Sequence, residues 1–127
     1  MELVAIVTLL ALAQYVIMGV RVGQARLRYG IEAPAITGHP VFERHFRVHQ
    51  NTLEQLVVFL PALWLFSAFV SPRLAALLGL VFIAGRYVYE RGYVANPQER
   101  HTGAMITMVT NGILVVGAFI GAIIAAL

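Results

Sequence analysis

The 127-residue sequence contains no cysteine, no lysine and no aspartate. Without cysteine the chain can form no disulfide and has no thiol nucleophile of its own, so any sulfur chemistry must come from a bound substrate. All nine basic residues are arginine, whose guanidinium group suits fixed, bidentate contacts with carboxylates better than a mobile ammonium does. The net charge of +3 is small and there is no basic run, which argues against a nucleic-acid partner.

Charged residues make up only 12% of the chain, whereas 60% are hydrophobic and the mean hydropathy is +0.81. This composition is typical of an integral membrane protein. Since each spanning helix needs about 20 apolar residues, the length allows about four spans with short connections. We therefore predict a single all-α membrane domain over residues 1–127, without internal repeats or a separate soluble domain.

Apolar runs and turn signals predict four helices. The first apolar run is followed by a polar continuation that Tyr29-Gly30 ends, and it lacks the basic region of a cleaved signal peptide, so we expect it to be retained. Proline after a capping residue opens the second helix at His39-Pro40 and ends the turn before the third at Ser71-Pro72. Asn96-Pro97 caps the fourth helix, and Pro61 predicts a kink in the second. The predicted segments are Leu3–Val20 with its continuation, His39 to about Val70, Leu74 to about Tyr93, and a last helix whose apolar run is Met105–Leu127.

Arginine is distributed asymmetrically between the two sides of this predicted bundle. The first and third connections and their helix ends carry eight arginines, and the second connection carries only Arg73. The positive-inside rule therefore predicts that connections one and three are cytoplasmic and that both termini lie outside. Short loops and the use of arginine favour a bacterial inner membrane.

The segment Phe42–Glu54, reading FERHFRVHQNTLE, carries charge directly into an apolar helix. At about 100° per residue, Arg47, Asn51 and Glu54 fall within roughly 60° of one another on that helix. An ionisable residue at the membrane edge is costly and usually faces a bundle interior or a wet cavity, so this face is a candidate polar pocket. The structural alternative is that these groups simply bond neighbouring helices.

The third and fourth helices offer a second wall for this pocket. Arg86, Tyr89 and Tyr93 are spaced i, i+3 and i+7, so their side chains share one helix face at the depth of Glu54. The alternative is an interfacial aromatic belt with snorkelling arginines, which we prefer for Tyr87 and Arg91.

Arg100 follows Asn96-Pro97 by about one turn and lies near a helix N-terminus, where a cation and free N–H groups would favour a thiolate. Its alternative role is that of a topology determinant. His45 and His49 have no third ligand at suitable spacing, so we expect no metal site, and His101 stays unassigned.

The polar residues on this side of the membrane are more numerous than packing requires. They suit a small zwitterionic ligand with carboxylates for arginine and an amine for Glu54, a description that glutathione fits. The set comprises Arg26, Arg47, Asn51, Glu54, Tyr89, Tyr93 and Arg100.

FERHFRVHQNTLE followed by GRYVYERGYVANPQER resembles the signature of the MAPEG proteins, membrane-associated proteins in eicosanoid and glutathione metabolism, and the likeness spans nearly the whole chain. The resemblance implies a four-helix up-down bundle, a homotrimer, and glutathione bound as co-substrate between protomers near the cytoplasmic face. It implies that Arg100 activates the thiol. It also implies glutathione contacts at Arg26, Arg47, Asn51, Glu54, Tyr89 and Tyr93, with His49 at a position where members carry Gln or His. Since a helix N-terminus contributes at most about 2 kcal/mol, we expect the Tyr93 hydroxyl to assist Arg100, and we expect Arg86, on the helix face of both tyrosines, to contact glutathione as well.

Three positions depart from the branches of that family: Thr52 stands where one branch has Asp, Gln55 where another has an aromatic residue, and Leu27 where that branch has a second Arg. The chain thus resembles an intermediate between branches. The expected function is a glutathione transferase in detoxification, with glutathione-dependent peroxidase activity as a further possibility, acting on hydrophobic electrophiles or lipid hydroperoxides from the membrane lipid. The alternative is a non-catalytic lipid- or glutathione-binding scaffold. A transporter or channel ranks third, because the sequence lacks broken-helix pairs and selectivity motifs.

Overall fold

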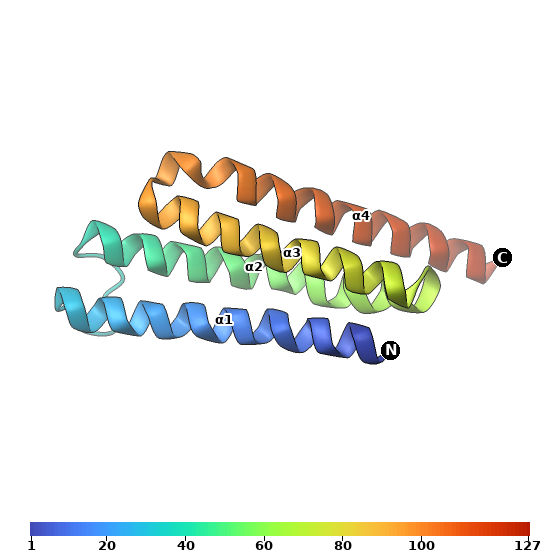
Figure 1. Cartoon of the computed structure of the whole chain (residues 1–127), viewed down its shortest axis with the longest axis horizontal. Coiled ribbons are helices and arrows are strands. Elements are labelled where there is room, and N and C mark those ends of the chain that lie inside the picture. Colours follow the sequence, from blue (N-terminus) through green and yellow to red (C-terminus); the bar gives the residue numbers. More distant parts are fainter.

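The computed structural model describes residues 1–127 and consists of four long α-helices and one short 3-10 turn, without strands (Figure 1). All four helices are long and apolar enough to cross a membrane, as predicted. The elements are α1 (Glu2–Tyr29), α2 (Pro40–Phe69), α3 (Pro72–Ala95), η1 (Pro97–Arg100) and α4 (His101–Ala126).

The predicted capping residues set the helix ends. Gly30 ends α1 in the left-handed conformation (φ 67°), which glycine adopts without steric cost. His39 Nδ1 accepts a hydrogen bond from the backbone N–H of Val41 (3.1 Å), and Ser71 Oγ accepts one from Leu74 (3.2 Å). The third helix begins at Pro72 rather than at the predicted Leu74, because the fixed φ of proline already fits the first turn.

Asn96 and Pro61 mark two further features of these helices. Asn96 Oδ1 accepts a hydrogen bond from the backbone N–H of Gln98 (3.2 Å) and so caps the 3-10 turn η1. The α-helix predicted to follow Asn96 directly begins only after this turn, at His101. Pro61 lies inside α2, which continues through it to Phe69.

The helices form an up-down bundle in which α1 and α4 each pack against both α2 and α3. Both termini and the α2–α3 turn lie at one end, and the α1–α2 and α3–α4 connections lie at the other (Figure 1). Eight of the nine arginines belong to this second end, which we call the basic end. The polar pocket residues predicted from the sequence therefore share one end of the bundle.

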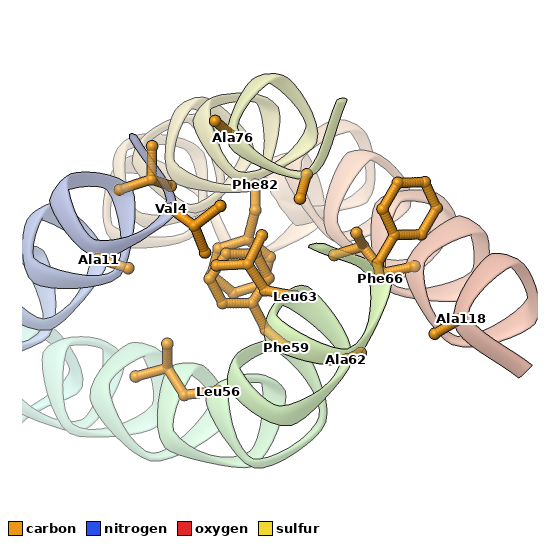
Figure 2. Packing of buried hydrophobic residues seen from close by; sticks show 13 residues of the cluster. Val4, Ala11, Leu56, Phe59, Ala62, Leu63, Phe66, Ala76, Phe82 and Ala118 are labelled. Atoms are coloured by element: carbon orange, nitrogen blue, oxygen red, sulfur yellow. The ribbon is translucent and has the colours of Figure 1, made fainter. Parts of the chain in front are cut away.

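The main hydrophobic core fills the half of the bundle away from the basic end. Phe59 and Phe82 stack at its centre with ring centroids 3.8 Å apart (Figure 2). Small residues of α1, including Val4 and Ala11, approach these rings from one side. Only 29 of 127 residues are buried, and leucine, isoleucine and valine side chains cover the outside of all four helices. Such an exterior suits lipid or a second protein chain rather than water.

Candidate functional site

Arg86 is the most unusual side chain at the basic end, because its guanidinium is completely buried (0% exposed) inside a membrane bundle. Its Nη1 donates a hydrogen bond to Asn51 Oδ1 (2.9 Å), and the guanidinium carbon lies 4.1 Å from the ring centroid of Tyr89. Nε and Nη2 have no hydrogen-bond partner within the chain, and no carboxylate lies within ion-pair distance. A buried cation without an anion is costly and marks a functional site by default.

The bond from Arg86 fixes the orientation of the Asn51 amide. Arginine only donates, so the amide atom that faces it must be the oxygen. The Asn51 Nδ2 group consequently points away from Arg86, and it donates to no other group of the protomer. Asn51 therefore offers two free N–H bonds to a ligand that carries a carboxylate or a carbonyl.

Tyr89 and Tyr93 extend this cluster toward the helix end. Their ring centroids lie 5.7 Å apart, as the predicted i, i+4 spacing requires. Tyr89 is buried against Met18 and Val48, whereas Tyr93 is only partly covered. The sequence prediction that Arg86, Tyr89 and Tyr93 share one helix face is confirmed.

Arg47 and Glu54 flank Asn51 on the same side of α2 and are exposed. Neither makes a side-chain hydrogen bond or an ion pair within the protomer. A free guanidinium, a free amide and a free carboxylate thus lie along one stripe of α2. This arrangement can bind a molecule that carries both an anionic group and an amine.

Arg100 ends the η1 turn directly before α4 and is exposed. Its Nη1 donates to the carbonyl of Pro97 (3.0 Å). Gly103, in the next turn, packs so closely on the backbone of Tyr89 that a Cβ at this position would collide with it. This contact holds the start of α4, and Arg100 with it, beside the tyrosine end of α3.

Arg26 and His49 both belong to the side of α1 that carries Tyr15, since Arg26 follows Tyr15 by eleven positions, about 20° around the helix. Arg26 donates to the carbonyl of Ala35 (2.6 Å) and lies 4.7 Å over the ring of Phe42. His49 stacks on Tyr15 of α1 with ring centroids 4.2 Å apart. Asn51 follows His49 by two positions, which is about 200° around the helix. The protomer therefore carries two partial sites, and we call the face with Asn51 the major half-site and the face with Arg26 and His49 the minor half-site.

Two interactions of this region were not predicted from the sequence. Arg21 of α1 forms an ion pair with Glu90 of α3, whose side chain is only 5% exposed. The Arg86–Asn51 bond joins α3 to α2. The only sequence signal for both interactions is the presence of charged residues inside apolar helices. It indicates that each charged residue has a partner but does not identify which residue that partner is. No group of three or more histidine or acidic side chains forms a metal site.

Comparisons with known proteins identify the family. The sequence profile described as the MAPEG family matches residues 4–120. The chain belongs to the MAPEG family. It is 45% identical over 116 residues to an uncharacterized protein of Synechocystis, covering 91% of this chain and 85% of that one. It is 38% identical over 121 residues to the human protein named microsomal glutathione S-transferase 2, covering 95% of this chain and 80% of the relative.

The bovine protein named leukotriene C4 synthase is a further relative, 37% identical over 98 residues, which are 77% of this chain and 65% of that protein. MAPEG membership and the four spanning helices confirm the predicted multi-pass membrane architecture. The relatives include proteins named for two different enzymes, a glutathione S-transferase and leukotriene C4 synthase, and one uncharacterized protein, so membership in the MAPEG family does not by itself fix the reaction.

Proposed function

We propose that this MAPEG protein is a membrane-bound glutathione transferase that activates the glutathione thiol for attack on hydrophobic electrophiles. The observation that carries the proposal is the bond from the buried Arg86 to the half-buried Asn51, which leaves the Asn51 N–H groups free between the exposed Arg47 and Glu54. Glutathione has two carboxylates, two amides and one amine, and this stripe of α2 offers complementary groups. Relatives named for glutathione transfer support the same conclusion.

In this proposal each residue of the major half-site has a separate task. Arg47 and Asn51 bind acceptor oxygens of glutathione, and Glu54 accepts hydrogen bonds from its amine. Tyr93 and Arg100 stabilise the sulfur as a thiolate after its proton has passed to solvent. The thiolate then donates an electron pair to an electrophilic carbon of the second substrate, a C–S bond forms, and the leaving group departs with its bonding electrons.

We further propose that a homotrimer completes the site. The protomer buries few residues and has little interior for a tripeptide, and its minor half-site lies on another face than its major one. A rotational assembly repeats one contact between two different faces, so Arg26 and His49 of one protomer would meet Asn51 of the next. Hydrophobic electrophiles would reach this boundary laterally from the lipid.

Glutathione titration of the purified protein tests the proposal. We expect saturable glutathione binding, a thiolate absorbance that appears below the pH at which free glutathione ionises, and conjugation of an activated aryl chloride. The control variant is Arg73→Gln, which removes one arginine at the opposite end of the bundle and should change none of the three readouts. Binding without thiolate formation or conjugation would support a glutathione-binding scaffold, and absence of glutathione binding would exclude both the transferase and that scaffold.

A further inference from the structure

A second cationic pocket lies at the basic end, on another side of α1 than the minor half-site. It is a cavity of about 160 Å³ between α1 and α2. Arg21 and Arg28 line it, and each is well over 100° around the helix from Arg26. The remaining lining residues are Gln24, Ala25, Tyr29, Val41 and His45.

Polar groups of two helices converge on this pocket with unused hydrogen-bonding capacity. Arg21 uses Nη1 in its ion pair with Glu90, which anchors the side chain to α3. Arg28 is exposed and makes no hydrogen bond or ion pair within the chain, and its guanidinium carbon lies 5.6 Å from the ring centroid of Tyr29. Gln24 and His45 make no side-chain hydrogen bond within the chain. The lining of the pocket therefore includes several N–H donors that the chain itself does not use.

The charge of the pocket matches one negative charge. Arg21 and Arg28 both line the pocket, and Glu90 pairs with Arg21 alone, so the charge of Arg28 has no counter-ion within the chain. A phosphodiester carries one negative charge and accepts several hydrogen bonds, so it is complementary to this set.

The depth of the pocket along α1 corresponds to the lipid headgroup layer. The apolar run Leu3–Val20 is about 27 Å long at about 1.5 Å per residue, close to the hydrocarbon thickness of about 30 Å. Arg21 follows this run directly, at the hydrocarbon boundary, and Arg28 lies about 10 Å further along the helix. Exposed apolar side chains such as Ile17 and Val20 continue from the pocket toward the membrane centre and offer a surface for acyl chains.

We propose that this pocket binds the phosphate of an anionic phospholipid whose acyl chains lie along α1. The phosphate accepts hydrogen bonds from Arg21, Gln24 and Arg28. A lipid with an added choline cation is disfavoured, because that cation would lie beside Arg28. Basic pockets between helices at the cytoplasmic surface are a recurrent type of lipid headgroup site. This proposal is independent of glutathione binding.

Native mass spectrometry of the intact protein in mild detergent tests the site, with phosphatidylglycerol, phosphatidylcholine and inorganic phosphate as separate probes. We expect adducts with phosphatidylglycerol, clearly fewer with phosphatidylcholine, and none with phosphate at equal concentration. Arg28→Gln should weaken phosphatidylglycerol binding about fivefold, the factor for one basic contact near a surface. Gln24→Leu should also weaken it, although the net charge is unchanged.

Arg91→Gln is the matched control, because Arg91 is exposed at the same end and lies over a tyrosine in the same way, 5.8 Å from the ring centroid of Tyr87. This variant should bind phosphatidylglycerol like the wild type. Equal weakening by Arg28→Gln and Arg91→Gln would show diffuse attraction and overturn the proposal. Equal binding of both lipids would overturn it as well, and binding of inorganic phosphate alone would assign the pocket to a soluble anion.

Discussion

Arg100 is exposed and bonds only to the carbonyl of Pro97 in its own turn, so its substitution should leave the bundle intact. If it stabilises the bound thiolate, Arg100→Ala should lower kcat about tenfold or more while leaving glutathione affinity nearly unchanged. The pH at which the bound thiolate appears should rise by about one unit, equivalent to about 1.4 kcal/mol. Arg100→Lys should restore part of the effect, since a point charge cannot reproduce the guanidinium fork.

Thiolate absorbance, titrated against pH in the wild type and both variants, checks this expectation. A helix N-terminus alone contributes about 0.3 to 1 kcal/mol, so a residual shift should persist in Arg100→Ala. The same thiolate pKa in all three proteins would mean that Arg100 only determines topology.

A substitution at Asn51 can change ligand binding without lowering the stability of the protein. In Asn51→Asp, a carboxylate replaces the amide beside the buried guanidinium of Arg86, so the melting temperature should not fall. The variant loses the free N–H donors and adds a negative charge, so the KM for glutathione should rise about 10- to 100-fold. The measurements are thermal unfolding and glutathione-dependent kinetics of the same preparation. An unchanged KM would show that Asn51 serves only to satisfy Arg86.

At the scale of the helices, the close approach of α4 to α3 depends on Gly103, where a Cβ would collide with the backbone of Tyr89. Gly103→Ala should therefore destabilise the protein by about 1–3 kcal/mol and lower its melting temperature by several degrees. Because the same contact positions Arg100, turnover should also fall. Gly112→Ala is the control in the same helix, since no atom lies within 4 Å of a Cβ built there. Equal melting temperatures for both variants would contradict this account.

The positions of the helices could be predicted from the sequence more completely than the contacts between side chains of different helices. His39, Ser71 and Asn96 cap backbone N–H groups as their local sequence predicts, because a cap depends on residues only a few positions away. The shared face of Arg86, Tyr89 and Tyr93 likewise follows from helical spacing alone.

The partners of buried charges depend on how one helix is rotated against another, which periodicity does not specify. The sequence places Arg86 and Asn51 on two faces of one predicted pocket but does not indicate that they bond directly. Glu90 gives no sign of its partner on α1, since sixty-nine positions separate it from Arg21. Helical spacing alone separates His49 from Asn51 by about 200°, but it does not indicate that His49 stacks on Tyr15 of α1.

At the scale of the whole molecule, the arginine asymmetry predicts an orientation in the membrane. Eight arginines lie at the basic end and only Arg73 at the other, so we expect the basic end in the cytoplasm and both termini outside. Reporter fusions that are active on only one side of the membrane, placed after Leu127 and within the loop between α1 and α2, measure this directly. A cytoplasmic C-terminus would overturn the orientation and separate the proposed site from the cytoplasmic glutathione pool.

The proposed sharing of the site between protomers predicts complementation between two inactive variants. Glu54→Ala removes the amine acceptor of the major half-site, and Arg26→Ala removes the cation of the minor half-site. Each variant alone should form trimers with little activity. A trimer that mixes them contains an intact site wherever the major half-site of an Arg26→Ala protomer meets the minor half-site of a Glu54→Ala protomer.

Random mixing of equal amounts makes about one site in four intact, so co-expression should restore about a quarter of the wild-type activity. If instead Arg26 and Glu54 acted within one protomer, every site of the mixture would lack one of the two groups and activity would stay at the level of the single variants. Native mass spectrometry of differently tagged protomers confirms that mixed trimers have formed before activity is compared. Because mixing two equally defective proteins cannot repair an unstable fold, recovery of activity would locate Arg26 and Glu54 of each working site on different chains.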